Sequence, residues 1–402
     1  MSRRPRPGRD RPLVIHLTTT DMSLDWLLGP QLRAFQASGY EVVGMSAPGP
    51  HLAALTAAGI RHVAVGSLTR RPGIADDLRA FRQLVRLLRA ERPDVLHTHN
   101  PKPGVLGRMA GRIARVPVVV NTQHGLYAQP TDRLRRRVPV YLAERLAAAC
   151  SHAELVQNPE HAHTLVHTLR VPARRVTVLG NGIDLVRFDG ARQARADRRC
   201  EWGFAAGDVV AGVVGRLVEE KGLHELFAAA HALRTTGSPV RMVVVGPNDP
   251  DKPDGASAAM LSAAADDGIV FVGARTDMPE CYSAMDVFVT ATHREGFPRA
   301  AMEASASGLP VVATDIRGCR QVVEHGVTGL LVPVRDPEAL AKALATLAAD
   351  PERRARMGAA GAAKAINDFD QQRVIDITLR TYERLLAERG LDGRAQSVSP
   401  RN

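Results

Sequence analysis

The chain is poor in the residues that mark several classes of protein. Aromatic side chains make up only 4% of its 402 residues, and its four cysteines lie far apart without a C-x-x-C pair. That spacing argues against a zinc site and against a disulfide framework. No run of about 18 apolar residues occurs, which argues against a membrane-spanning helix. The basic start of the chain lacks the apolar core of a secretory signal, so we expect a cytoplasmic protein.

The length predicts two domains, because a single hydrophobic core stops growing near about 250 to 300 residues. Strand-like apolar runs alternate with amphipathic stretches, which predicts α/β domains with parallel sheets covered by helices on both faces. We expect the carboxyl ends of both sheets to face one ligand-binding cleft. The first series of runs lies at 12–18, 41–45, 61–65, 94–99, 116–122, 153–157 and 175–179, and the second at 208–215, 241–246, 268–273, 286–290 and 309–314.

Turn residues suggest where the domains divide. The sequence Gly-Asn-Gly-Ile-Asp at 180–184 ends the first series of runs, so the N-terminal domain is expected at 1–184 and the C-terminal domain at 185–370. A helix over 371–389 is expected to cross back to the first domain. Residues 390–402 resemble a disordered tail in composition.

Helical periodicity is clearest in the stretch 76–92. Its apolar residues recur at helical spacing, and arginines occupy other positions. We expect the buried stripe of this helix to consist of Leu78, Phe81, Val85 and Leu88. A further helix is expected at 337–349.

Excess positive charge is confined to the first half of the chain. Residues 1–184 contain 26 lysines and arginines against 13 acids, whereas residues 185–402 contain 27 against 29. The asymmetry favours an anionic partner for the first half, such as the inner face of the membrane or a phosphorylated lipid. An arginine-rich composition without functional meaning is the alternative. Nucleic acid is disfavoured because aromatic residues are not interleaved with the basic ones.

The strongest chemical signal follows the predicted strand 286–290, where Glu295 and Glu303 stand on either side of a turn and a helix start. Gly296, Phe297 and Pro298 form the turn, and the helix starts near Arg299 and Ala300. The first amides of a helix lie outside its own hydrogen-bond ladder and at a positive dipole end, which suits a diphosphate. Glu303 can then accept hydrogen bonds from both hydroxyls of a ribose. Each glutamate also has an explanation without a ligand. Glu303 can be a solvated charge on a helix, and Glu295 can simply favour the start of a helix.

A second signal is the sequence GVVGRLVEEKG at 212–222. A predicted strand ends at Gly215, and two cations, Arg216 and Lys221, follow within one short loop. Glycine permits a close approach of the backbone to a ligand, and the cations can neutralise a leaving diphosphate. Cations after strands are common, so this pattern alone is moderate evidence for a diphosphate site. Together with the two glutamates it is strong evidence.

Histidines and arginines give two weaker signals in the first half. His124 follows a predicted strand, and there it can bond a sugar hydroxyl or carry a proton, unless it is a structural histidine. His97 and His99 are further candidates on the acceptor side, and a metal site is not indicated because no carboxylates are near them. The arginine-rich segment 132–137 suits a membrane-surface helix or an ordinary solvated one.

Seven segments in order resemble the motifs of retaining glycosyltransferases of family 4. They are NTQHG, QNPE, NGID, GRLVEEKG, the two glutamates with seven residues between them, GLPVVATD and GVTGLLVP. The resemblance covers nearly the whole chain and points in particular to the group that makes capsular polysaccharide, exopolysaccharide and lipid-linked oligosaccharide. It implies the GT-B fold, in which two doubly wound Rossmann-like domains face a cleft.

The resemblance also implies a reaction. A hexose or N-acetylhexosamine would move from a nucleotide diphosphate sugar, with UDP expected, to a saccharide or a polyprenyl-diphosphate-linked acceptor, without metal or other cofactor. Arg216 and Lys221 would hold the diphosphate and Glu303 the ribose.

The sugar ring has its own implied contacts. Glu295 and the backbone around Phe297 and Pro298 would hold it in the second domain. His124 is similar to the histidine of the first domain that contacts the donor sugar in this family.

One motif of the family is missing. Many members carry a glycine pair after the first strand, but the loop at 18–26 reads TTTDMSLDW. The segment from Thr18 to Ser23 therefore contacts either a phosphate or the acceptor.

Other functions compete with sugar transfer. A sugar-nucleotide epimerase or hydrolase on the same fold, and a non-catalytic protein that only binds the donor, remain open. A nicotinamide dehydrogenase is disfavoured because no G-x-G-x-x-G follows the first strand of either domain.

Overall fold

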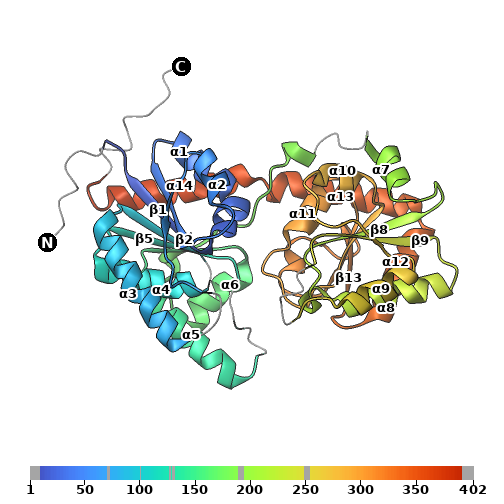
Figure 1. Ribbon diagram of the computed structural model, residues 1–402, viewed down its shortest axis with the longest axis horizontal. Coiled ribbons are helices and arrows are strands. Elements are labelled where there is room, and N and C mark those ends of the chain that lie inside the picture. The colour runs from blue at the N-terminus through green and yellow to red at the C-terminus, as the bar shows by residue number, and fades with distance from the viewer. Residues whose placement is uncertain are drawn as a thin grey trace, which may run out of the picture. The chain divides into compact units, whose positions relative to one another are not determined.

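The chain forms two compact units (Figure 1). The structure, a computed structural model, describes residues 10–69, 73–99, 101–125, 128, 132–188, 194–248 and 254–391. Unit 1 comprises Met1–Gly180 together with Gln372–Asn402, and unit 2 comprises Asn181–Gln371. Of the tail expected at 390–402, all but the first two residues lie outside the described part of the chain.

Unit 1 contains a parallel sheet of seven strands in the order β3-β2-β1-β4-β5-β6-β7. The strands are β1 (Leu13–Thr20), β2 (Glu41–Ala47), β3 (Arg61–Ala64), β4 (Val95–His99), β5 (Val118–Gln123), β6 (Ala153–Val156) and β7 (Val176–Val178). Alternate residues of β1 enter different cores: Leu13 and Ile15 face one core, and Val14 faces the other. Because both faces are buried, the strands read as continuous apolar runs.

Helices cover both faces of this sheet. They are α1 (Gly29–Ala37), α2 (Leu52–Ala57), α3 (Ile74–Glu91), α4 (Lys102–Ala114), α5 (Leu134–Ala148), α6 (Pro159–His163) and α14 (Gln371–Ala387). α3 and α4 supply the core on one face. α1 and α14 supply the core on the other, so the last helix of the chain packs within unit 1.

The expected buried stripe of α3 is wrong in part. Leu88 is buried as expected, but Leu78 is 45% exposed, and the other fully buried positions are Ala80 and Leu84. Helical periodicity fits two alternative buried faces of α3 that differ by one residue. Packing against α4 selects the face that contains the small Ala80.

Unit 2 contains a parallel sheet of six strands in the order β10-β9-β8-β11-β12-β13. The strands are β8 (Val209–Val214), β9 (Val240–Val245), β10 (Val270–Phe271), β11 (Val287–Thr290), β12 (Val311–Thr314) and β13 (Gly329–Val332). The edge strand β13 was not among the expected strands. Its four residues, GLLV, begin with Gly329 and are followed by Pro333, which weakens the strand pattern, and its place in the sheet depends on pairing with β12.

The helices of unit 2 also lie on both faces of its sheet. They are α7 (Arg195–Glu201), α8 (Leu223–Thr235), α9 (Ala258–Asp266), α10 (Met278–Ser283), α11 (Arg299–Ala306), α12 (Pro337–Ala349) and α13 (Pro351–Asp368). α12 has the bounds expected from sequence, because Asp336 accepts a hydrogen bond from the Ala339 amide and caps its start (2.8 Å). Within the described part of the chain, no helix has the length and apolar character needed to cross a bilayer.

Each sheet has a point at which the strand order reverses. The reversal lies between β1 and β4 in unit 1 and between β8 and β11 in unit 2. The structure therefore confirms the prediction of two doubly wound α/β domains. Ligands of such sheets bind at the carboxyl ends of the strands beside this switch point.

Candidate functional site

Three of the predicted donor-site residues follow β8 at the switch point of unit 2. Gly215 comes directly after the strand, Arg216 is exposed, and a 3-10 turn ends at Lys221. Gly222 follows with φ of 75°, and a Cβ atom there would lie 2.2 Å from the carbonyl oxygen of Ala291. Only glycine permits this close approach of the loop after β8 to the loop after β11.

Hydrogen bonds also tie these two loops together. The Thr292 hydroxyl and the backbone N–H of His293 both donate to the carbonyl oxygen of Glu220, at 3.1 and 2.9 Å. The Thr314 hydroxyl, at the end of β12, donates to the carbonyl oxygen of Thr292 (2.6 Å). Sequence reasoning missed both threonines, because a hydroxyl after a strand carries no distinctive spacing.

The joined loops bring Lys221 and Glu295 into an ion pair. Their side chains are 29% and 26% exposed, so solvent and ligands reach the pair. The backbone at Glu295 is held as well, since a Cβ atom on Gly318 would lie 2.3 Å from its carbonyl oxygen. An ammonium group has three donors. A diphosphate can therefore bind Lys221 while the contact with Glu295 persists.

Glu303 lies on α11, and both of its carboxylate oxygens have protein partners. The Tyr282 hydroxyl donates to Oε2 (2.9 Å), and Arg299 Nε donates to Oε1 (3.0 Å). Burial, with the Glu303 charge adding to it, raises the pKa of Tyr282 well above its usual value. Each carboxylate oxygen has a second lone pair, so Glu303 can still accept a hydrogen bond from a ribose hydroxyl. Tyr282 belongs to no sequence motif and was not predicted.

The turn before α11 offers its backbone rather than its side chains. The Phe297 ring is half-buried and packs edge to face on the core residue Phe369, with the ring centroids 5.9 Å apart. Pro298 precedes the helix, and no side chain of the described residues caps it. The amides of Arg299 and Ala300 therefore lie at a helix start, which attracts an anion.

In unit 1, histidines gather at the switch point. His16 on β1 is in register with His97 on β4, and His99 ends β4. Hydrogen bonds of 3.1 Å join Gln157 Nε2 to His124 Nδ1, His124 Nε2 to His99 Nδ1, and His99 Nε2 to His16 Nδ1. Of these residues, sequence reasoning named His97, His99 and His124. It missed Gln157 and His16.

The Gln157 amide sets the direction of this chain of hydrogen bonds. An amide nitrogen only donates, so His124 and His99 each accept at Nδ1 and donate from Nε2. His16 then carries its proton on Nε2, which is buried and has no hydrogen-bond partner among the described residues.

His97 is held by a helix from the far end of the chain. Its Nδ1 lies 2.5 Å from the hydroxyl of Tyr382 on α14, and its Nε2 lies 2.7 Å from Thr122 Oγ1 on β5. Its ring also stacks on His99, with centroids 4.3 Å apart. The return of α14 to unit 1 therefore completes the histidine network.

Burial keeps these histidines neutral. It lowers the pKa of His16 to about 3 and that of His124 to about 4. It also lowers the pKa values of His97 and His99 well below the usual range, and the neighbouring histidines add to the effect. At neutral pH, His124 is therefore a hydrogen-bonding group rather than an acid. Both of its ring nitrogens have protein partners, so a substrate hydroxyl would have to replace one of them.

Three of these histidines lie close enough together to suggest a metal site. One ring nitrogen each of His16, His97 and His99 lies within 4.8 Å of the others. However, five of the six ring nitrogens of the three already form hydrogen bonds with protein groups. The three histidines are therefore arranged as a hydrogen-bond network. Their rings do not leave three lone pairs available to bind a metal ion.

The loop from Thr18 to Ser23 is held by its own side chains. The hydroxyl groups of Thr20 and Ser23 lie 3.2 Å apart, and buried Asp21 accepts from the backbone N–H of His51 (2.7 Å). Contact of this loop with a phosphate or an acceptor stays a prediction.

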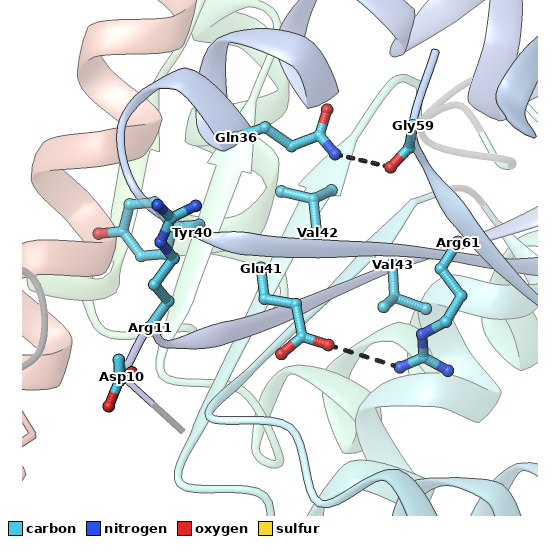
Figure 2. Close-up of a pocket in the computed structure, with 9 residues that line it drawn as sticks. All are labelled: Asp10, Arg11, Gln36, Tyr40, Glu41, Val42, Val43, Gly59 and Arg61. Atoms are coloured by element: carbon cyan, nitrogen blue, oxygen red, sulfur yellow. Dashed lines mark hydrogen bonds and ion pairs between the residues drawn. The ribbon is translucent and has the colours of Figure 1, made fainter. Parts of the chain in front are cut away.

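A cavity of about 520 Å³ opens at the opposite edge of the unit 1 sheet (Figure 2). It lies at the start of β2 and β3, where Glu41 approaches Arg61 to 3.8 Å and Gln36 donates to the carbonyl oxygen of Gly59 (2.9 Å). Because ligands of parallel sheets bind at the carboxyl ends, this cavity at the amino ends is not a candidate donor or acceptor site.

Comparison with solved structures identifies the class of fold. The chain superposes on HepE of Anabaena, solved in complex with UDP, with a TM-score of 0.77 and 21% identity over 93% of this chain and 100% of that one. The likeness confirms the GT-B fold.

Comparison of sequences identifies the family. The model of "Glycosyl transferases group 1" matches residues 194–364, and that of "Glycosyltransferase Family 4" matches residues 31–187. A D-inositol 3-phosphate glycosyltransferase of Thermobispora bispora is 31% identical over 75% of this chain and 74% of its own length. The chain belongs to the group 1 and family 4 glycosyltransferases, and is therefore a sugar-transferring enzyme.

Two further relatives carry more specific names. The capsular polysaccharide biosynthesis glycosyltransferase CapM of Staphylococcus aureus is 27% identical over 93% of this chain and 98% of its own length. The UDP-Gal:alpha-D-GlcNAc-diphosphoundecaprenol alpha-1,3-galactosyltransferase of Escherichia coli is 29% identical over 72% of this chain and 76% of its own length.

Proposed function

We propose that the enzyme transfers a hexose or N-acetylhexosamine from a UDP-sugar to a saccharide carried on a polyprenyl diphosphate, with retention of the anomeric configuration, in cell-surface polysaccharide synthesis. The observation that carries this proposal is the contact between Lys221 and Glu295 at the switch point of unit 2. It supports the proposal because a cation suited to a diphosphate lies beside a carboxylate suited to sugar hydroxyls.

Each residue around this pair would bind a different part of the donor. Lys221 and exposed Arg216 face the charge that grows on the diphosphate as the sugar leaves, and the helix start at Arg299 adds its dipole. Glu303 accepts from the ribose with the lone pairs that Tyr282 and Arg299 leave open. Because these groups already neutralise the diphosphate, we propose that no metal ion is needed.

The named relatives support the choice of substrates. The Escherichia coli relative takes its name from a UDP-sugar donor and a diphosphoundecaprenol acceptor, and CapM from capsular polysaccharide. HepE was solved with UDP, with UDP and glucose, and with UDP-glucose. These names support two parts of the proposal, a lipid-linked saccharide as the acceptor and a uridine nucleotide in the donor.

For unit 1 we propose that neutral His124 bonds a hydroxyl of the sugar. Gln157 and His99 fix the orientation of its ring. The substrate would therefore find an acceptor at Nδ1 and a donor at Nε2 already in position. Replacement of one of these two partners by the substrate gives His124 its contact without a change of charge.

A transfer assay tests the proposal. The enzyme is incubated with radiolabelled UDP-galactose, UDP-glucose or UDP-N-acetylglucosamine and a chelator, with and without a polyprenyl-diphosphate-linked saccharide. We expect label on the lipid from one donor only, in the presence of chelator, and an axial linkage by NMR. Release of free sugar or an epimerised nucleotide sugar without acceptor would instead show a hydrolase or epimerase. Donor binding without any turnover would show a binding protein.

A further inference from the structure

The outer face of α5 carries an apolar stripe that faces solvent. The side chains of Leu134, Val138, Leu142 and Leu146 recur every four residues and are 64, 56, 55 and 55% exposed. Residues at this spacing share one side of a helix. Single exposed leucines need no explanation, but four in a row on one helix mark a contact surface.

Arginines accompany the stripe, and acids do not. Arg133, Arg135 and Arg145 are exposed on the same helix or at its start. At 100° per residue, Arg135 and Arg145 fall within the sector of the four apolar side chains. The single acid in α5, Glu144, points inward, where it is 3% exposed and binds Arg108 of α4. The outer face is therefore apolar and positively charged throughout.

Buried ion pairs fix this orientation of the helix. Arg108 is fully buried and binds Glu144 of α5 at 2.5 Å and Glu154 of β6 at 2.8 Å. A rotation of α5 that turned its leucines inward would separate Glu144 from Arg108 and leave the buried guanidinium with Glu154 as its remaining carboxylate partner, which destabilises the fold. The apolar stripe is thus held outward by the fold. In Figure 1, α5 lies at the margin of unit 1, beside α4.

We propose that α5 docks unit 1 on a membrane surface rich in anionic lipid. Leucines flanked by arginines match the boundary between acyl chains and negatively charged head groups. A second copy of the chain fits the same face less well, because two such helices would oppose their arginines. The excess of positive charge in residues 1–184 acts in the same direction.

The position of α5 in the chain connects this surface to the substrate. β5 ends at Gln123, His124 follows, and α5 starts at Leu134. A membrane contact at α5 would bring the carboxyl edge of the unit 1 sheet near the lipid bilayer. The advantage of bringing the sheet edge near the bilayer rests on the proposed lipid-linked acceptor. The membrane contact itself can be tested without any sugar transfer.

Vesicle sedimentation tests the docking. The full-length enzyme is mixed at low salt with vesicles of phosphatidylcholine, alone or with about 30% phosphatidylglycerol. We expect sedimentation with the anionic vesicles, weakened about fivefold for each of Arg133→Gln and Arg135→Gln, with that difference lost at high salt. For Leu142→Ser combined with Leu146→Ser, we expect a loss of at least about tenfold.

Matched controls lie in unit 2. Ile366 on α13 is 68% exposed and Arg356 on the same helix is 67% exposed, so Ile366→Ser and Arg356→Gln change exposed side chains of the same kinds outside α5. Both should sediment as the wild type does. Thermal melting of each variant checks that it is folded.

Two results would overturn the proposal. One is equal sedimentation of the wild type and the double leucine variant. The other is a lipid-free dimer in analytical ultracentrifugation that the double leucine variant abolishes, since it would make the stripe a contact between two copies. Sedimentation with lipid but no transfer to polyprenyl-linked acceptor would leave docking in place and remove the proposed function.

Discussion

Replacement of Lys221 by alanine is expected to lower kcat/KM for sugar transfer by about 10² to 10³-fold, because it removes a group that would stabilise charge in the transition state. The lysine lies at the switch point of unit 2, partly exposed, in contact with Glu295. In the proposed reaction its ammonium group neutralises the diphosphate as the bond to the sugar breaks. Loss of that charge raises the barrier to transfer more than it weakens donor binding, so kcat should fall more than KM rises.

Lys364→Ala is the matched control for this substitution. Lys364 lies on α13 of unit 2, where it pairs with Asp368 at 2.6 Å and is 26% exposed, close to the exposure of Lys221. Its replacement should leave transfer unchanged. Lys221→Arg, which keeps the charge, should retain more activity than Lys221→Ala. Transfer by Lys221→Ala within a factor of about three of the wild type would remove the diphosphate role.

We expect mild acid to destabilise unit 1 through its buried histidines. Burial lowers the pKa of His16 to about 3 and that of His124 to about 4, and lowers those of His97 and His99 well below 6.5. A histidine with a lowered pKa in the folded state takes up its proton only when the protein unfolds. Its contribution to stability is fully present above the unfolded pKa of about 6.5 and is lost as the pH falls.

Between about pH 7.5 and 5.5, each such histidine should cost about 1.4 kcal/mol of unfolding free energy, and the four together several kcal/mol. Urea unfolding followed by circular dichroism at each pH measures the change. His16→Phe removes one titrating ring, which stacks on Phe35, and should reduce the dependence by one proton. His224→Gln, at a 67% exposed histidine of unit 2, should leave it unaltered. A urea midpoint that does not move over this range contradicts the neutral network.

The architecture could be predicted from sequence because both sheets are buried on both faces. Apolar runs such as those of β1 and β8 therefore stand out, and their alternation with helices specifies a parallel sheet. The short edge strand β13 did not stand out, because its pairing with β12 rather than its composition makes it a strand. On α3, the expected stripe was wrong at Leu78, whereas Leu88 is buried and Phe81 and Val85 are partly buried, because packing selects between neighbouring faces that share one periodicity.

The candidate site could be predicted only where its residues fall in compact motifs. Gly215, Arg216 and Lys221 lie within seven residues of one another, and the segment from Glu295 to Glu303 is a single turn and helix. The partners of these residues are remote in sequence. Tyr282 reaches Glu303 from α10, and Tyr382 reaches His97 across 285 residues. Such contacts arise from the fold, and no local spacing indicates them.

Thermal unfolding with UDP, GDP or ADP in the presence of chelator tests the proposed binding of a nucleotide diphosphate to unit 2 through Glu303. A ligand at about 100 times its Kd adds about 2.7 kcal/mol, which raises the melting temperature by several degrees. We expect UDP to stabilise the wild type and the control Glu352→Ala, a change at an 89% exposed position, but not Glu303→Ala. An equal shift of Glu303→Ala, or no shift of the wild type by any of the three nucleotides, would contradict a donor site at Glu303.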